Sequence, residues 1–243
     1  MDIESIISRV TDAVMAELGS QTAPHSSAIE LAGTIEHSLL NPDASAEVIR
    51  KGCEEAKKYG FANVCVSPYY TAMAADILRG SGVAVCVPVG FPHGAASTKA
   101  KCAEIREAIM SGATELDVSM MITAIKSGDF DGMKKDIFEM VSVAGSRAKI
   151  KAIYEQGLLT HDEKVRALSI SAECGVDYIK ISNALTGKKA CAEDVKYVRS
   201  KIGGSIGIKI DGGIKDAAKV RELMAAGAQR FGCSASVNIV TGQ

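Results

Sequence analysis

The feature that most constrains the fold is a regular alternation of short β-type runs with stretches of helical periodicity. Apolar spacing of the helical kind is clearest in residues 46–59 and 162–174, and glycines close several such stretches before the next run begins. Strands that alternate with helices form parallel sheets. The predicted strands occupy residues 34–37, 62–66, 83–89, 115–119, 149–154, 177–182, 206–210 and 230–234.

Eight strand–helix pairs account for nearly the whole chain of 243 residues. A (β/α)8 barrel takes about 250 residues. A doubly wound open sheet is the alternative, but no G-x-G-x-x-G follows the first strand and the spacing is even throughout. We therefore predict the α/β class, with a (β/α)8 TIM barrel as the catalytic domain over residues 31–243. Residues 1–30 are predicted to form an N-terminal helix, Ile3–Leu18, and a connector.

Charge and cysteine content exclude several classes of protein. The net charge of −1 gives no basic surface for nucleic acid. The seven cysteines form no C-x-x-C pair and the four histidines no H-x-x-x-H pair, so neither a disulfide framework nor a zinc site is expected. The first 19 residues do not read as a signal peptide, and no apolar run reaches the roughly 20 residues that cross a bilayer. We expect a cytoplasmic protein that binds neither membranes nor nucleic acid.

Side-chain parity along the strands predicts a charged barrel interior. In the run I-G-I-K-I-D (206–211) the isoleucines share one face and belong against the helices, so Lys209 and Asp211 face inward. A structural barrel would fill this space with branched apolar side chains. The same reasoning places six charged side chains in one enclosed space, namely Asp117, Lys151, Glu155, Lys180, Lys209 and Asp211.

Two inward lysines on neighbouring strands indicate amine chemistry. Burial and a second nearby cation both lower a lysine pKa, and a neutral amine can condense with a carbonyl group. We therefore expect a lowered pKa at one of the pair Lys180 and Lys209, with an inward carboxylate such as Asp117 to transfer protons or to hold the second lysine in place. A satisfied salt-bridge network is the structural alternative. A Mg²⁺-dependent lyase is another, with Asp117, Glu155 and Asp211 as ligands.

The last two strands are followed by glycine-rich turns, D-G-G-I-K (211–215) and G-C-S-A-S (232–236). In this fold the loops after the seventh and eighth strands commonly bind phosphate through backbone N–H groups. A phosphorylated substrate is therefore expected at this end of the site.

The motifs of the chain resemble those of the deoxyribose-phosphate aldolase family from about Ile35 to Val240. They occur in order along the sequence and include V-G-F-P-H-G-A-A-S-T-K-A-K. The matching stretches are residues 36–45, 63–68, 89–101, 112–129, 151–160 and 227–234. The resemblance implies a class I aldolase, an aldehyde-lyase without metal or other cofactor. Such an enzyme reversibly joins acetaldehyde to glyceraldehyde 3-phosphate to form 2-deoxyribose 5-phosphate.

The resemblance also implies roles for individual residues. Lys180 would form the Schiff base, Lys209 would perturb its pKa, and Asp117 would belong to the proton relay. The partner implied is a small aldehyde or sugar phosphate. By analogy with other barrel enzymes, a second copy of the chain is also expected, most simply in a dimer. The residues expected to contact substrate are Ser38, Cys65, Glu155, Asp211, Gly212, Gly213, Lys215, Gly232 and Ser234.

The sequence departs from the family pattern at the substrate end. Ala184 replaces a glycine, Asp211 a hydroxyl-bearing residue, Met121 an asparagine, and Ala235 the second of two serines. These changes leave two further hypotheses. The enzyme could use a different acceptor aldehyde, or the barrel could have lost activity and serve as a binding protein.

Overall fold

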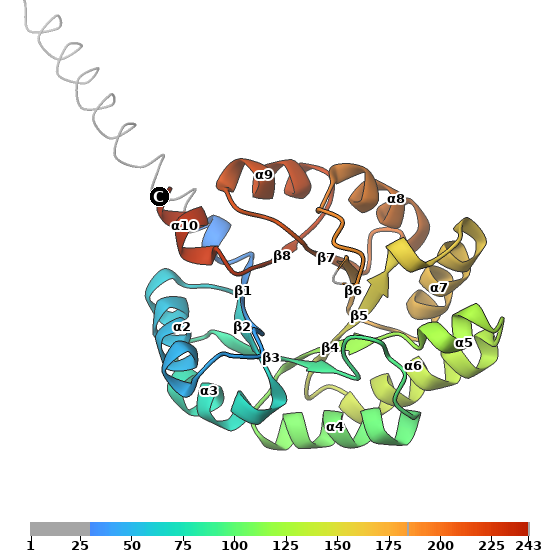
Figure 1. The fold of residues 1–243 in the computed structure, drawn as a ribbon, viewed down its shortest axis with the longest axis horizontal. Helices are drawn as coiled ribbons and strands as arrows, with labels where there is room; N and C mark the ends of the chain where they lie inside the picture. The colour runs from blue at the N-terminus through green and yellow to red at the C-terminus, as the bar shows by residue number, and fades with distance from the viewer. Residues whose placement is uncertain (1–29, 184, 243) are drawn as a thin grey trace, which may run out of the picture.

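The computed structural model describes residues 30–183 and 185–242, which form a closed barrel of eight parallel strands in the order of the sequence (Figure 1). The predicted fold is confirmed, and the strand boundaries lie within two residues of those expected. The strands are β1 (Ile35–Leu39), β2 (Asn63–Val66), β3 (Ala84–Val89), β4 (Glu115–Ser119), β5 (Lys149–Glu155), β6 (Tyr178–Ser182), β7 (Gly207–Asp211) and β8 (Arg230–Cys233).

Helices surround the barrel as an outer ring (Figure 1). The predicted helix Ile3–Leu18 lies outside the described residues. The predicted division of the chain near residue 30 stays a prediction. The helices are α2 (Ala46–Tyr59), α3 (Thr71–Leu78), α4 (Thr98–Met110), α5 (Ile122–Lys126), α6 (Phe130–Ala144), α7 (His161–Glu173), α8 (Ala192–Ile202), α9 (Ala217–Ala225) and α10 (Ser236–Thr241), with short 3₁₀ turns at Pro68–Tyr70 and Gln156–Leu158.

Local sequence signals set the ends of several helices. Ser45 and Ser97 accept hydrogen bonds from backbone N–H groups at the starts of α2 and α4. Thr160 and Glu163 form a capping box at the start of α7. Gly60 ends α2 with φ +72°, a left-handed conformation that glycine adopts without steric cost.

The apolar core lies between the strands and the helices, where parity places it. Leu116, Ile150, Ile179 and Ile208 are each no more than 2% exposed and pack in the main hydrophobic cluster. Lys180 and Lys209 are register partners on β6 and β7, so their side chains leave the sheet on the same inner face. The outer face of the strands packs against the helices and forms the hydrophobic core, and the inner face carries the charged side chains.

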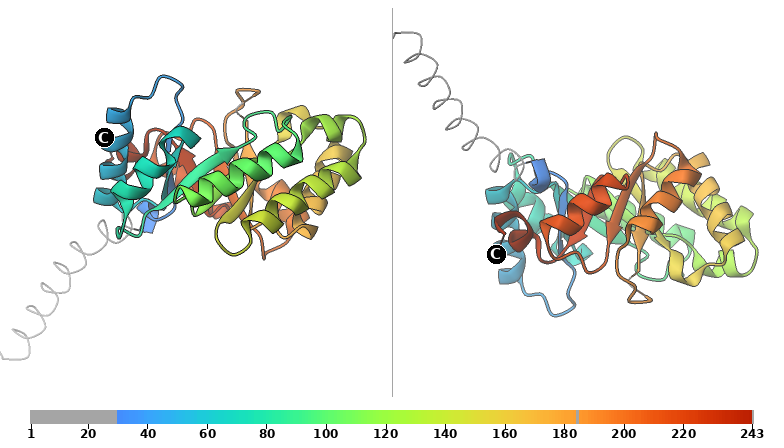
Figure 2. Two further views of the ribbon diagram at one scale, coloured as in Figure 1. Left: turned by 90° about the horizontal axis from the view of Figure 1, so that it is seen from below. Right: turned by 90° about the horizontal axis from the view of Figure 1, so that it is seen from above.

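The loops that follow the strands build one end of the barrel. The β1–α2 loop and the segment before α8 project from this same end in both side views (Figure 2). In (β/α)8 enzymes the active site lies at the C-terminal ends of the strands. Within the described residues, no helix combines the length and hydrophobicity required to span a membrane.

Candidate active site

A cavity of about 690 Å³ opens at the C-terminal ends of β1, β2, β6, β7 and β8. Lys180 and Lys209 lie at its base. Its wall contains most of the residues that the sequence predicted to contact substrate, namely Ser38, Cys65, Asp211, Gly212, Gly213, Lys215, Gly232 and Ser234.

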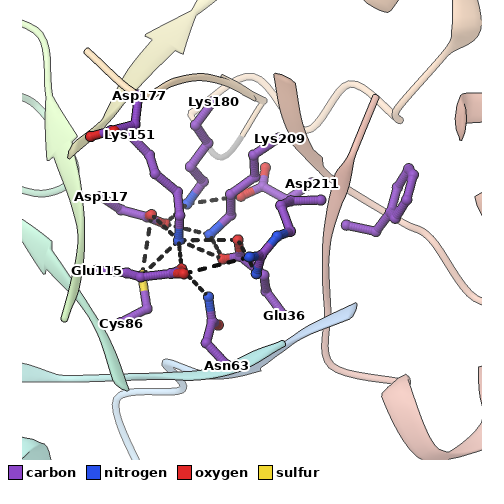
Figure 3. Close-up of polar contacts among 12 residues, drawn as sticks. Glu36, Asn63, Cys86, Glu115, Asp117, Lys151, Asp177, Lys180, Lys209 and Asp211 are labelled. Atoms are coloured by element: carbon purple, nitrogen blue, oxygen red, sulfur yellow. Dashed lines mark hydrogen bonds and ion pairs between the residues drawn. The ribbon is translucent and has the colours of Figure 1, made fainter. Parts of the chain in front are cut away.

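Lys180 lies between two carboxylates at the base of the cavity (Figure 3). Its Nζ is 2.9 Å from Oδ2 of Asp117 and 3.0 Å from Oδ2 of Asp211. The Asp117 side chain is fully buried, whereas that of Asp211 is 25% exposed. The ring of Phe91, from the loop after β3, has its centroid 5.9 Å from Lys180 Nζ. The amine is therefore 4% exposed but borders the cavity.

Lys209 connects the same Asp117 carboxylate to a second acid. Its Nζ lies 2.7 Å from Oδ2 of Asp117 and donates a short hydrogen bond to Glu36 on β1. Asp117 thus accepts from both lysines through one oxygen, and from the Cys86 thiol at 3.2 Å through the other. The predicted proximity of Lys180, Lys209 and Asp117 is present in the structure.

The charges of the lysines and acids shift each other's pKa values. Burial opposes the charged form of Asp117, but Lys180, Lys209 and Lys151 outweigh burial and hold its pKa well below the ordinary value. Burial also raises the pKa of Glu36, but Lys151 and Lys209 outweigh this effect and lower the pKa to about 2. Both acids are therefore ionised at neutral pH.

The expected lowering of the Lys180 pKa is wrong for the resting site. Burial lowers this pKa, as predicted, but Asp117 and Asp211 together outweigh burial and the charge of Lys209, so the pKa of Lys180 is raised. The pKa of Lys209 is also raised, because Asp117 and Glu36 outweigh the effect of burial. The sequence argument weighed the second cation but not the number of acids around it. Lys180 therefore begins as an ammonium group and must lose a proton before it can attack a carbonyl.

A second charged layer lies below the lysine pair (Figure 3). Lys151 Nζ is 3.0 Å from Oε1 of Glu36 and 2.5 Å from Oε2 of Glu115. Asn63 donates to Glu115 at 2.6 Å, and Arg230 Nη2 lies 3.6 Å from its other oxygen. This layer balances the charges beneath the cavity and fixes Glu36, which in turn orients Lys209.

A buried ion pair behind β4 supports the loop that carries Phe91. Lys101 on α4 contacts Asp136 on α6 at 2.5 Å, and both side chains are fully buried. The same ammonium lies 3.4 Å from the carbonyl oxygen of Gly94 and 3.5 Å from that of Ser119. Gly94 packs so closely on β4 that an added Cβ would lie 1.9 Å from the carbonyl oxygen of Met120. Lys101 thus joins the loop after β3 to the end of the strand that bears Asp117.

Replacing Lys101 with methionine is expected to destabilise the protein by about 3–5 kcal/mol, because it leaves the Asp136 charge buried without its cation. Urea unfolding followed by circular dichroism measures this loss. The double variant Lys101→Met/Asp136→Leu should recover much of it, since apolar packing often replaces a buried ion pair without cost. A single variant as stable as the wild type would show that the pair does not hold this region.

Some predicted site residues lie outside the cavity wall. Glu155 is buried at the end of β5, where it accepts a hydrogen bond of 2.5 Å from Ser182. Met121, just beyond β4, packs against the hydrophobic core, and Ala184 lies outside the described residues. Ala235 does line the cavity, beside Ser234.

The sequence argument missed Glu36, Glu115 and Arg230. Glu36 is fully buried in the middle of β1, a strand whose boundaries were set two residues short and whose parity was not assigned. A polar residue facing inward in E-H-S-L could have been found by the same alternation rule. Glu115 has the same inward parity as Asp117 on β4, but its contact with Lys151 was not predicted.

The three carboxylates expected to chelate Mg²⁺ are not gathered in the described part of the chain. Asp117 and Asp211 both bind Lys180, and Glu155 binds Ser182. The side-chain groups close enough to share a metal ion there are Cys65, Cys86 and Asp117, and Glu36, Cys86 and Glu115. In both groups the carboxylates already contact lysine ammonium groups.

A closed (β/α)8 barrel with a charged cavity at the C-terminal ends of its strands has the architecture of a barrel enzyme. The sequence profile of the DeoC/LacD family aldolases matches residues 33–241, and this chain belongs to that family. It is 44% identical over 208 residues to a deoxyribose-phosphate aldolase of Brevibacillus brevis, covering 86% of this chain and 94% of that one. It is 42% identical over 212 residues to the one of Clostridium tetani, covering 87% and 98%.

Solved structures agree with the family assignment. The structure named QR15, an aldolase, superposes with a TM-score of 0.83 at 31% identity, over 87% of this chain and 95% of that one. The tetrameric deoxyribose-phosphate aldolase of Aeropyrum pernix superposes with a TM-score of 0.82 at 28% identity, over 88% and 91%.

Proposed function

We propose that the protein is a class I aldolase that reversibly cleaves 2-deoxyribose 5-phosphate into acetaldehyde and glyceraldehyde 3-phosphate, with Lys180 as the Schiff-base residue. The observation that carries the proposal is the amine of Lys180 at the base of the cavity, 2.9 Å from Asp117, whose carboxylate also contacts Lys209. Relatives at 41–44% identity bear the name of this activity.

The geometry supports different roles for the charged groups, with Lys180 forming the imine and Asp117 and Lys209 transferring protons. An imine at Lys180 withdraws electrons from the adjoining carbon atoms, so the carbon–carbon bond can break to leave an enamine. Asp117 accepts hydrogen bonds from Lys180 Nζ, the reacting nitrogen, and from Lys209 Nζ, and so connects the two amines. Asp117 and Lys209 are therefore suited to move protons during formation and protonation of the enamine. This chemistry uses groups of the chain itself and requires no cofactor.

The far end of the cavity supports binding of a phosphate. Gly212 and Gly213 follow β7 and line the cavity, with φ +113° and +67°, conformations that glycine adopts without steric cost. Lys188, Lys189 and Lys215 also line the wall and supply positive charge. A phosphate dianion is favoured where backbone N–H groups and lysines converge.

Reductive trapping tests the proposed function. We expect sodium borohydride with acetaldehyde to leave an ethyl group on Lys180, located by mass spectrometry of peptides. Deoxyribose 5-phosphate should protect the same lysine and release acetaldehyde. Labelling of a different lysine, or no labelling together with inhibition by a chelator, would reject the Schiff base at Lys180.

A different acceptor aldehyde is the second candidate. Ala235 lines the cavity where the family pattern has a second serine, so one hydroxyl group is missing from its wall. Cleavage and condensation assays on phosphorylated and unphosphorylated aldehydes separate the two candidates. A clear preference for glyceraldehyde 3-phosphate would remove the second.

The remaining proposals concern the location, the substrates and the oligomeric state of the enzyme. We infer a cytoplasmic enzyme that acts on small aldehydes or sugar phosphates and assembles as a homo-oligomer, with a dimer as the expected state. The tetramer named for the Aeropyrum pernix relative supports self-association as such.

A further inference from the structure

Asp211 stands out because it faces the cavity and touches the reacting nitrogen. It is the last residue of β7, and its Oδ2 lies 3.0 Å from Lys180 Nζ. The family pattern has a hydroxyl-bearing residue at this position. The Asp211 carboxylate faces the amine, opposite Asp117 (Figure 3).

The barrel leaves room for this carboxylate. Gly232 on β8 is the register partner of Asp211. A Cβ added at Gly232 would lie 3.0 Å from the Asp211 Cβ and 3.6 Å from Cε of Lys209. The first of these distances is tighter than side chains normally tolerate. Glycine at this position therefore allows an acid and a lysine to lie together beside Lys180.

The two acids on Lys180 differ in what they can do with a proton. Asp117 is fully buried and contacts Lys151, Lys180 and Lys209, and these cations hold its pKa well below the ordinary value. In the resting site, with all three cations in contact, Asp117 is therefore a poor proton acceptor. Within residues 30–183 and 185–242, Asp211 pairs with Lys180 alone, and its side chain is 25% exposed to the cavity. Asp211 can thus take a proton and exchange it with water or substrate.

We propose that Asp211 is a further catalytic residue, the cavity-side carboxylate that accepts the proton of Lys180 and returns it during imine formation. This inference rests on the proposed function, because it takes Lys180 as the Schiff-base residue. Asp117 and Lys209 would keep their part in the later enamine steps. Asp211 would act before them, at the step where the amine is made nucleophilic.

The proton balance of this step is complete without a co-reactant. Lys180 Nζ gives a proton to Asp211 Oδ2, and the freed electron pair attacks the carbonyl carbon of the aldehyde. The carbonyl oxygen takes a second proton from the attacking nitrogen, which gives a neutral carbinolamine. Asp211 then returns its proton to the carbinolamine hydroxyl group, which leaves as water as the C=N bond forms. The ammonium group and aldehyde have become a protonated imine and water, and Asp211 is again a carboxylate.

The test is the time course of trapping by acetaldehyde and cyanoborohydride in Asp211→Asn and Asp211→Ala. Acetaldehyde carries no phosphate, so phosphate binding does not affect the result. We expect both variants to form the imine about a hundredfold more slowly at neutral pH, as loss of a proton-transfer group predicts. Added formate should restore part of the rate in Asp211→Ala, because a small carboxylate can occupy the vacated space. Asp76→Asn, which removes a carboxylate that is 72% exposed, is the matched control.

The outcomes separate this inference from the proposed function. Trapping of wild-type Lys180 with slow, formate-dependent trapping of the Asp211 variants supports both. If the wild type is trapped and the variants react as fast or faster, Asp211 only holds the resting ammonium and the inference is wrong. Slow variants that formate does not accelerate would indicate a structural role and also reject it. If wild-type Lys180 is never trapped, the proposed function itself fails.

Discussion

Replacing Lys180 with methionine is expected to lower kcat for cleavage of deoxyribose 5-phosphate by about a thousandfold or more, equivalent to about 4 kcal/mol of transition-state stabilisation. Methionine keeps the length and apolar stem of the side chain but has no amine, so no imine can form. A coupled assay for acetaldehyde measures the loss. Borohydride trapping of the variant should show no ethyl group at position 180.

The control for this variant is Lys51→Met, which removes a lysine whose side chain is 78% exposed on α2. It should retain full activity. Lys180→Met should also remain folded, because Asp117 keeps its contacts with Lys151 and Lys209 and the Asp211 side chain is 25% exposed. A folded Lys180→Met variant that still cleaves the sugar phosphate at the wild-type rate would overturn the proposed mechanism.

The fold could be predicted because the sequence patterns that specify its strands and helices are local and repeated. Alternation along each strand separates Ile208 and Ile210 from Lys209, and this pattern depends on chain geometry rather than on distant contacts. Serine and glycine at helix ends act over a few residues, so Ser45 and Gly60 mark α2 without knowledge of the rest of the chain. Strand β1 was set two residues short because it carries polar residues on its inner face.

The sequence predicted which residues form the site, but not how their charges shift the pKa of Lys180. Register alone brings Lys180 beside Lys209, and Asp117 on β4 reaches both across the barrel interior. The sign of the Lys180 pKa shift depends on Asp117 and Asp211 together outweighing burial and Lys209. The contact of Glu36 with Lys209 depends on closure of the barrel between β8 and β1. Closure joins residues almost 200 positions apart and leaves no local trace in the sequence. The contact between Lys101 and Asp136 escaped notice for the same reason, because helix-to-helix pairing is not encoded by periodicity.

Replacing Asp117 with asparagine is expected to have the largest combined effect on stability and activity. The substitution keeps the volume but removes the charge that two lysines contact through one oxygen. Loss of one partner from a buried ion-pair network costs about 3–5 kcal/mol, because the remaining cations are left uncompensated. Loss of a proton-transfer group should also reduce kcat by about a hundredfold.

The pH dependence of stability distinguishes a charge effect from a packing effect. The pKa of Asp117 is lower in the folded protein than its ordinary value, so the unfolded state binds more protons as the pH falls. The stabilisation is therefore fully present at neutral pH and declines below about pH 4, where an unfolded aspartate begins to protonate. Wild type and Asp117→Asn should thus differ most at pH 7 in urea unfolding, and the gap should narrow as the pH falls through the acid range.

Glu36 adds a similar acid-range loss in both proteins, because its pKa is also lowered when folded, to about 2. The Asp117 charge itself raises the pKa of Glu36, so its removal lowers that pKa further and moves the Glu36 loss in Asp117→Asn to lower pH. Asp76→Asn, at an exposed position, should follow the wild-type curve. A gap between wild type and Asp117→Asn that stays constant from pH 7 into the acid range would mean that the variant loses packing rather than charge. In that case the lysine pair would be held in place by the barrel walls and not by the carboxylate between them.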